Sequence, residues 1–574
     1  MLPMLYPVDH LYGFDRRNFL LAAGGTLTTP LARVLQAQPP AAASRRLLVN
    51  WDGSMIHCFG RAALGNPEGP LTREQFVSLV FRPLDQKAVD ALFFSFGSGN
   101  VAEYQSNVLE WPGQADQLNF PEARTWHGGI EVDPADQYRN PRALADAGAN
   151  PPAVVVEECH RRGLDAFVSL RMNDCHDGQH AKGVRPNPEL PTFKRQNLDW
   201  LVPDLDMWSA LNYAHPRVRA LKLRVIEEFF DRWDFDGIEL DWLRHTMHFP
   251  RGTEAENAHH LNTFMRQVRK SLRQRADKRG RPIEIAVRIP ERVDWCLEGG
   301  FDIRTWIAED LVDMLILGQG LTELPTLSEF RTLMTARQLP IYPCVTTYGN
   351  GYRIYPEDVV RGNAANLWRD GADGLSTFNW FFHGDWRRSL LGQIADPARL
   401  AGRDKRYVLV QRVEAPRREP GGDYVRFNTQ SRAAPVPMNL NVGSVAEMAI
   451  PLADDASPGR SSISTAELCI GFEFSGESDE LELTLNGQRL AVHHDDDRVE
   501  MGSVNQQIDI PAGQGLLGFP STQSLDVSFA GLRIDVPPEF LEAGHNHLTM
   551  ELRRRTPGID HPLRVTRVEL ATYY

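Results

Sequence analysis

Between residues 46 and 400, short apolar runs rich in β-branched or aromatic residues alternate with longer segments whose apolar positions recur at helical spacing. This alternation predicts parallel strands joined by helices, and eight such strands indicate one closed (β/α)8 barrel. The strands are expected at Leu47–Trp51, Ala91–Phe96, Ala166–Arg171, Gly237–Trp242, Ile283–Ile289, Met314–Leu317, Ile341–Val345 and Gly374–Trp380.

One helix and one long loop stand out between the third and fourth predicted strands. The segment from Pro216 to Trp233 has apolar residues at helical spacing, and Pro216 suits a first helical turn. The segment from Cys175 to Ala214 is rich in Pro, Asn, Asp and His and has no clear period. It is expected to be a loop at the carboxyl end of strand three, where barrel enzymes build their sites.

After about residue 400 the pattern changes to alternation at every second position. Leu481–Leu485 and His547–Leu552 alternate in this way, and Asn486-Gly487 is a hairpin-turn signal. This region is predicted to be an antiparallel β-sandwich. The domain expectation is therefore a leader over 1–43, a catalytic barrel over 44–403, and a linker with a C-terminal sandwich over 404–574.

Composition narrows the classes of partner. The 574 residues carry a formal net charge of -13, which argues against nucleic acid, because phosphate binding needs a basic surface. No apolar run after the N-terminus is long enough to span a bilayer, so no integral membrane span is expected. The six cysteines include no CxxC and are expected to be buried free thiols.

The N-terminus has the features of an export signal. Asp15–Leu21 contains Arg16 and Arg17 directly before a weakly apolar, Ala/Gly-rich stretch, and Ala41–Ala43 offers small residues for cleavage. The segment resembles a twin-arginine signal peptide. The resemblance implies a periplasmic or secreted protein.

The fourth predicted strand holds the most informative sequence, Asp236–His245. Because side chains alternate faces in a strand, Glu239 and Asp241 point to the same side, toward the barrel axis. Inward carboxylates near the carboxyl end of a barrel strand are typical of catalysis. Glycosidic cleavage needs two carboxyl groups, one to protonate the leaving oxygen and one to attack or to activate water. Asp236, on the other face, is expected to be structural.

The strand order, Asn212–Pro216 and the Asp236–His245 phrase resemble the family-10-like glycosyl-hydrolase barrel proteins of bacteria, over roughly residues 46 to 400. The phrase also resembles strand four of glycoside hydrolase family 18 and of the α-amylase superfamily. The chitinase glutamate would fall at Leu243, so this sequence departs from that pattern. The amylase resemblance places Asp241 at the nucleophile position, with Glu239 where an arginine usually stands.

Asp241 is therefore the first candidate for catalysis, with pairing to Arg288 as the alternative role. Glu239 is a further catalytic candidate, or a partner that orients Asp241 or an arginine. Glu291, after strand five, is the leading candidate for the second acid, by analogy with amylase-type barrels. Asp174 and Asp177, after strand three, are the alternatives.

Aromatic and polar residues at the strand ends predict a sugar-binding cleft, because flat rings stack on the apolar faces of pyranose rings. A tryptophan taken singly, Trp295 and Trp386 included, is more often a core residue, and only the set at the strand ends favours a cleft. The substrate-binding candidates are Trp51, Asp174, His176, Trp242, Arg244, His245, Arg288, Arg292, Trp380 and His383.

The histidines allow a competing interpretation. His176 with His180, or His245 with His248, could bind a divalent metal together with Asp174 or Asp241. The spacing is loose and neither pair lies on a predicted helix, so no metal or other cofactor is expected.

The leading hypothesis is hydrolysis of a poly- or oligosaccharide. The alternatives are a non-catalytic carbohydrate-binding surface protein and a metal-dependent barrel hydrolase. Four arginines, at 171, 244, 288 and 292, are expected near the carboxylates. Any guanidinium left over after pairing would suit a uronate or a sulfate, so an acidic sugar beside strand five is a further hypothesis.

Overall fold

The computed structural model describes most of the chain after the predicted leader. The described residues are 45–85, 87–120, 125–127, 130–178, 187–205, 208–318, 327–346, 355–378, 380, 385–409, 434–456, 462–492, 498–501, 506–510, 521–525 and 529–574. The predicted export signal, His180, His383 and most of the predicted linker lie outside them.

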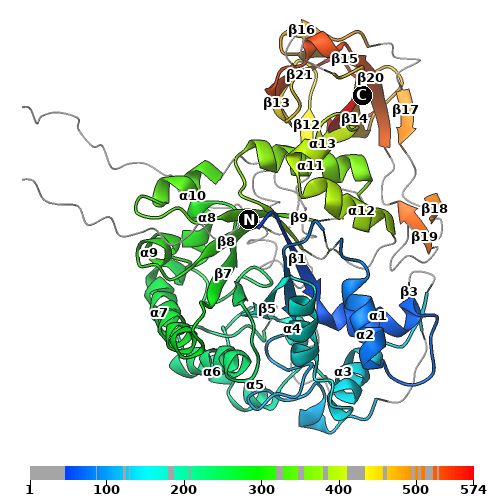
Figure 1. Cartoon of the computed structure of the whole chain (residues 1–574). Coiled ribbons are helices and arrows are strands. Elements are labelled where there is room, and N and C mark those ends of the chain that lie inside the picture. Colours follow the sequence, from blue (N-terminus) through cyan, green and yellow to red (C-terminus); the bar gives the residue numbers. More distant parts are fainter. Residues whose placement is uncertain are drawn as a thin grey trace, which may run out of the picture. The chain divides into compact units, whose positions relative to one another are not determined.

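A closed barrel of eight parallel strands forms the first part of the described chain (Figure 1). Going round the barrel, the strands follow chain order and each hydrogen-bonds to its neighbours, which confirms the (β/α)8 prediction. They are β1 (Leu47–Asp52), β2 (Ala91–Ser95), β5 (Asp165–Arg171), β6 (Gly237–Asp241), β7 (Glu284–Ile289), β8 (Met314–Leu317), β9 (Ile341–Val345) and β10 (Leu375–Thr377).

Helices cover the outside of the barrel and bury one apolar face each. The predicted helix before strand four is α6 (Pro216–Arg232), with Pro216 in its first turn and His215 accepting at its N-cap. The others are α1 (Gly53–Ala63), α2 (Arg73–Phe81), α3 (Asp136–Asp146), α4 (Pro151–Arg161), α5 (Thr192–Gln196), α7 (Glu254–Arg279), α8 (Val293–Glu298), α9 (Ile303–Ala308), α10 (Leu327–Leu333), α11 (Glu357–Arg369), α12 (Asp385–Ile394) and α13 (Pro397–Leu400).

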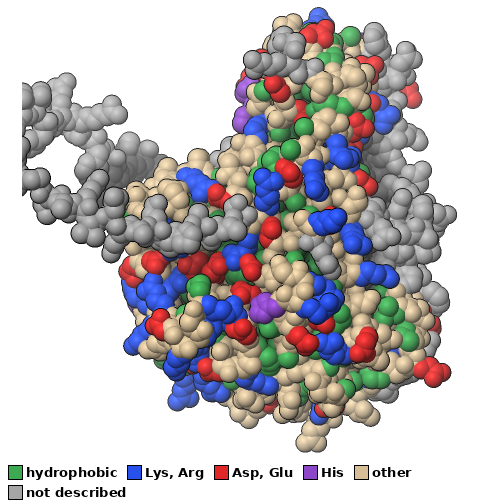
Figure 2. Space-filling model, in the orientation of Figure 1, with side chains coloured by type: hydrophobic (Ala, Val, Ile, Leu, Met, Phe, Trp, Pro, Cys, Tyr) green, Lys and Arg blue, Asp and Glu red, His purple; other side chains and the backbone are tan. Residues whose placement is uncertain are grey.

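None of the helices in the described ranges combines the length and the apolarity needed to cross a bilayer. The visible face of the molecule carries acidic and basic side chains interspersed (Figure 2). All six cysteines are free, and five of them are fully buried, as predicted.

The barrel interior changes from apolar to polar along its axis. Large side chains fill the barrel below the carboxyl ends of its strands, where the rings of Phe93 and Phe167 stack with their centroids 4.4 Å apart. Gly237 is required beside them, because a Cβ there would lie 2.3 Å from Phe167 Cε1. Above this layer the inward positions are polar, and they include Glu239 and Asp241. The apolar layer therefore supports a polar layer at the carboxyl ends of the strands.

The amino ends of the strands are closed by ion pairs. Asp236 accepts from the backbone N–H of Ala166 at 2.8 Å and pairs with Arg281 and with His160. Arg45 pairs with Asp165 at 2.6 Å and with Glu284 at 2.7 Å, and so joins β5 to β7. The structural role expected for Asp236 is confirmed.

Two antiparallel sheets with an apolar core of their own form the C-terminal part, which confirms the predicted sandwich. β15 has strictly alternating burial, and Asn486 and Gly487, both at positive φ, turn it into β16 as the hairpin signal predicted. One sheet contains β11 (Lys405–Val408), β12 (Met438–Leu440), β14 (Thr465–Glu473), β17 (Arg498–Met501), β20 (Phe529–Val536) and β22 (Leu563–Tyr573); the other contains β13 (Val445–Leu452), β15 (Glu480–Leu485), β16 (Gln488–Arg489) and β21 (Gly544–Arg554).

Two small strand pairs complete the described structure. β3 (Thr125–His127) pairs with β4 (Ile130–Val132), and β18 (Gln506–Ile510) pairs with β19 (Ser521–Leu525). Four single turns of 3-10 helix occur at Gln114–Asp116, His176–Gly178, Leu198–Trp200 and Pro538–Phe540.

Candidate functional site

A continuous chain of polar contacts crosses the carboxyl ends of β1, β5 and β6. Arg171 donates from Nη2 to Asp52 Oδ2 at 2.6 Å and from Nη1 to Asp174 Oδ2 at 3.1 Å. Asp174 Oδ1 lies 2.7 Å from His176 Nδ1, and His176 Nε2 lies 2.9 Å from Arg244 Nη2. We call Asp52, Arg171, Asp174, His176 and Arg244 the mouth cluster.

The hydrogen bonds of His176 determine which of its ring nitrogens carries the hydrogen. Arginine only donates, so His176 Nε2 accepts from Arg244, and Nδ1 carries the hydrogen that Asp174 accepts. The side chain of His176 is 29% exposed and that of Asp52 is 11% exposed, whereas Asp174 is buried. Asp52, His176 and the half-buried Arg244 are therefore the partly accessible members of the mouth cluster.

Three residues from separate segments form a second set beside the mouth cluster. Gln137, at the start of α3, donates from Nε2 to Glu103 Oε1 and to Glu189 Oε1, at 3.2 Å in each case. Glu103 also bonds the side chain of Ser54, and the backbone N–H of Ser54 donates to Asp52 Oδ1. Glu189 is half-buried, whereas Glu103 is buried. A single amide thus holds two carboxyl groups next to the end of β1.

The carboxyl groups at this end of the barrel differ in their electrostatic environment. Burial alone would raise the pKa of Asp52, but the guanidinium groups of Arg171 and Arg244 together hold it below its ordinary value. Burial, reinforced by the charge of Asp52, raises the pKa of Glu103 to about 8. Burial and the charge of Asp174 raise the pKa of Glu189 to about 7. At neutral pH the site therefore offers an ionised carboxylate, Asp52, together with two carboxyl groups that retain a proton in a large part of the molecules.

The two acids of strand four face inward as predicted, but they lie below the mouth cluster. Asp241 accepts from Arg288 Nη2 at 2.7 Å and from the backbone N–H groups of Leu243 and Arg244 at 2.9 and 3.0 Å. It is 2% exposed. This is the pairing with Arg288 that the sequence allowed as an alternative, and it also fixes the turn that carries Arg244.

Glu239 lies one layer deeper and is held by neutral donors. Its Oε2 accepts from Asn50 Nδ2 at 2.9 Å and from Ser169 Oγ at 2.5 Å, and Arg288 Nε is 3.9 Å from its Oε1. Burial, together with the negative charge of Asp241, raises the pKa of Glu239 to about 7. Its position matches the orienting role that the sequence proposed as an alternative to catalysis.

Arg292, which follows strand five (β7), pairs with carboxylates outside the mouth cluster. Arg292 pairs with Asp294 at 3.1 Å and with Glu329 at 3.2 Å, and its guanidinium lies over the Trp295 ring. These two carboxylates, one exposed and one half-buried, already neutralise the charge of Arg292, so its surroundings do not support an anionic subsite built on it. Glu291 is buried, at 2% exposed.

Three tryptophans predicted to bind sugar are buried instead. Trp51 points away from the barrel axis and donates from its indole N–H to Val80 O at 3.0 Å. Trp242 is completely buried among aromatic side chains that include Phe264 and Trp306. Trp380 is 2% exposed and belongs to the main apolar core. The prediction is wrong for all three, because all three side chains are buried. Trp51 and Trp242 are buried because odd-numbered positions of β1 and even-numbered positions along β6 face the helices.

Of the two predicted histidine pairs, one includes His180, which lies outside the described residues, and the other, His245 with His248, does not converge on a common site. His248 is buried against Tyr213 and Phe301. His176, His245 and Asp174 instead come together, with one potential ligand atom each within 4.8 Å of the others. The backbone N–H of Cys175 donates to His245 Nδ1 at 3.2 Å, so neutral His245 has its hydrogen on Nε2. That face offers a donor rather than a lone pair, and two arginines flank it, so these residues fit a dication poorly.

Sequence reasoning missed Asp52, Glu103, Gln137 and Glu189. Asp52 gave a usable signal, because it follows strand one at the position whose parity points inward. The other three lie on two loops and a helix, and no spacing in the sequence relates them to one another.

No family model matches the chain, and no curated protein matches it. Among solved structures, it is similar to the PgaB (BpsB) glycoside hydrolase domain from Bordetella bronchiseptica, with 11% identity, 58% of this chain and 94% of that chain covered, and a TM-score of 0.35. It is also similar to alpha-L-fucosidase isoenzyme 2 from Paenibacillus thiaminolyticus (13%, 62% and 48%, TM-score 0.37). A third is chitinase ChiW from Paenibacillus sp. (9%, 90% and 52%, TM-score 0.36). The chain spans about half the length of the latter two.

Proposed function

We propose that the protein hydrolyses O-glycosidic bonds of a poly- or oligosaccharide at the mouth cluster. The observation that carries this proposal is the pair of unlike carboxyl groups at the carboxyl end of the barrel. Asp52 is held ionised by arginines, and Glu189 has a pKa raised to about 7. Glycosidic cleavage needs one ionised carboxylate and one carboxyl that can donate a proton at neutral pH.

In this mechanism Glu189 donates its proton to the oxygen of the leaving sugar while positive charge develops at the anomeric carbon. Asp52 either attacks that carbon or removes a proton from the attacking water. Arg171 and Arg244 keep Asp52 ionised until it reacts. Asp241 positions Arg244 and neutralises Arg288 without touching substrate. The resemblance of strand four to glycosidase barrels supports the same reaction class.

The first test compares Asp52→Asn and Glu189→Gln with the wild type on a panel of glycans and aryl glycosides. Asp52→Asn should lower kcat on every substrate, by about a hundredfold or more. Glu189→Gln should impair sugars with poor leaving groups far more than activated aryl glycosides, because only the former need protonation. Asp165→Asn, at the amino end of the barrel, is the matched control and should retain turnover.

Equal losses on both substrate classes for Glu189→Gln would contradict its role as the acid. The anomeric configuration of the first product, followed by NMR, separates attack by Asp52 from activation of water by Asp52. If the wild type binds glycans but hydrolyses none of them, the protein is a carbohydrate-binding protein and the proposed hydrolysis is refuted.

The alternative of a metal-dependent hydrolase rests on the proximity of Asp174, His176 and His245 alone, because their hydrogen bonds fit a dication poorly. Metal analysis of the purified protein, with and without chelator, tests it. Stoichiometric metal that is required for turnover would favour that candidate over the carboxylate mechanism.

Export by the twin-arginine route also stays a proposal. Replacement of Arg16 and Arg17 by lysine should retain the protein in the cytoplasm.

A further inference from the structure

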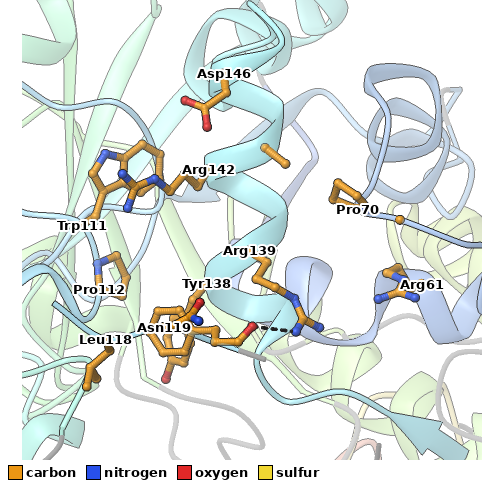
Figure 3. A pocket seen from close by; sticks show the side chains of 13 residues that line it. Arg61, Pro70, Trp111, Pro112, Leu118, Asn119, Tyr138, Arg139, Arg142 and Asp146 are labelled. Atoms are coloured by element: carbon orange, nitrogen blue, oxygen red, sulfur yellow. Dashed lines mark hydrogen bonds between the residues drawn. The ribbon is translucent and has the colours of Figure 1, made fainter. Parts of the chain in front are cut away.

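A hollow of about 440 Å³ lies between α3 and the segment that follows β2 (Figure 3). Trp111, Leu118 and Phe120 line it from that segment, and Tyr138 and Arg142 line it from α3. Its volume falls in the range of small-molecule sites. The rings of Phe120 and Tyr138 pack with their centroids 4.8 Å apart and form one wall.

The arginines that line the hollow have different duties. Arg61 pairs with Asp136, and Arg139 pairs with Asp133 and Asp136 and donates to Phe120 O at 3.0 Å. These two hold α3 against its neighbours. Arg142 is exposed, and within the described ranges no carboxylate lies close enough to form an ion pair with it. Its guanidinium lies 5.9 Å from the centre of the Trp111 ring.

The polar groups of the hollow suit hydroxyl groups. Arg142 and the amide of Asn119 donate, and the exposed carboxylate of Asp146 accepts, one helical turn after Arg142. A sugar hydroxyl both donates and accepts, whereas a uronate or sulfate would face the charge of Asp146. Trp111 supplies an aromatic surface beside these groups, which a pyranose ring needs.

The hollow lies next to the proposed reacting groups. Gln137 holds Glu103 and Glu189, and the following residue, Tyr138, lines the hollow. The charges of Glu189 and Glu103 act on the Tyr138 hydroxyl. A sugar chain that occupied the mouth cluster could therefore extend along α3 into the hollow.

We propose that this hollow is a remote subsite for a neutral pyranose unit of a polymeric substrate, bound by Trp111, Arg142 and Asp146. The proposal rests on the proposed function and adds that the enzyme binds long sugar chains more tightly than short sugars. Binding at a remote subsite contributes to the affinity for long chains and leaves the chemistry of short substrates unchanged.

The test uses the full chain and three variants: Trp111→Ala, Arg142→Gln and, as matched control, Arg224→Gln. Arg224 is an equally exposed helix arginine away from this hollow. The probes are neutral hexasaccharides of glucose, galactose and N-acetylglucosamine, hexagalacturonate, and aryl monoglycosides. Binding is measured by calorimetry and kcat/KM by product release.

Trp111→Ala and Arg142→Gln should each weaken binding and lower kcat/KM for a neutral hexasaccharide about tenfold. The aryl monoglycoside should be cleaved as by the wild type, and Arg224→Gln should change neither. Unchanged hexasaccharide affinity, or equal losses on the monoglycoside, would overturn the subsite. Tighter binding of hexagalacturonate that depends on Arg142 would overturn its neutral class.

Failure of the proposed function gives a different pattern. If the hollow is a subsite but the mouth cluster is not catalytic, Trp111→Ala still weakens hexasaccharide binding in a protein that cleaves nothing. If the mouth cluster is catalytic but the hollow is not a subsite, cleavage occurs and the variants leave it unchanged. If no neutral hexasaccharide is bound, the subsite is overturned. If, in addition, neither hexagalacturonate nor any aryl monoglycoside is cleaved, the proposed function is overturned as well.

Discussion

Glu103→Gln should make the protein more stable at alkaline pH. The variant retains the shape of the side chain and its hydrogen-bonding partners, Ser54 and Gln137, and it removes the ionisation. Glu103 is 2% exposed, and no hydrogen bond reaches its Oε2 within the described ranges. The native fold therefore has to bury a charge whenever this carboxyl ionises.

The size of the effect follows from the difference in pKa between the two states. In the unfolded chain the carboxyl ionises near 4.5, whereas in the folded protein burial raises its pKa to about 8. Between these values the folded state holds a proton that the unfolded state has lost, so the free energy of unfolding falls as pH rises. At about 1.4 kcal/mol per pKa unit, Glu103 lowers wild-type stability by at most about 5 kcal/mol above pH 8.

The assay is urea unfolding of wild type and variant at intervals from pH 5 to pH 9, followed by tryptophan fluorescence. The two proteins should have similar free energies of unfolding at pH 5. The difference in free energy of unfolding, in favour of the variant, should increase up to pH 8 and then stay constant. Glu158→Gln is a control of opposite sign. Burial opposes the ionisation of Glu158, but Arg162 and Arg161 lower its pKa, so that variant is the less stable one above pH 4.5. A gap for Glu103→Gln that does not widen would show that the carboxyl is ionised in the folded protein.

Three further changes test other parts of the structure. Asp241→Asn should lower the free energy of unfolding by about 3–5 kcal/mol and lower kcat, because it leaves Arg288 buried without its closest anion. A double variant with Arg288→Met that is no more stable than Asp241→Asn would contradict this. Burial lowers the pKa of Lys222 to about 7, so wild-type stability should rise between pH 7 and pH 10.5, and Lys222→Met should abolish that part of the rise in chemical unfolding. Arg45→Met should lower the free energy of unfolding, measured by thermal unfolding, by about 1–2 kcal/mol and leave turnover unchanged, since Arg45 pairs with Asp165 and Glu284 at the end of the barrel opposite the site. Loss of turnover would refute the idea that these ion pairs act on stability alone.

The barrel could be predicted because each strand and each helix has its own local pattern of apolar positions, and the fold retains both patterns. The same parity placed Glu239 and Asp241 inward, and applied to strand one it would have put Trp51 outside and Asp52 inside. The tryptophans were misplaced because their position at strand ends outweighed their parity. This error was avoidable from the sequence.

The composition of the site could not be predicted in the same way. Glu103, Gln137 and Glu189 meet because two loops and the start of α3 fold over the end of β1. Their approach depends on loop paths of many residues, which no periodicity encodes. The same holds for His245, whose tautomer is set by a backbone N–H from the loop after β5.

The polar layer inside the barrel has a consequence for enzymology. Glu239 gains or loses a proton near neutral pH beneath residues that are proposed to react, yet its hydrogen bonds within the described part of the chain go to the barrel side chains Asn50 and Ser169. Its ionised form adds a negative charge under the mouth cluster and so raises the pKa of carboxyl groups above it. A plot of reaction rate against pH would then contain an inflection that belongs to the scaffold. Kinetic pKa values from such a plot describe the coupled layer as a whole, and matching them to single catalytic groups requires the Glu239→Gln variant as a reference.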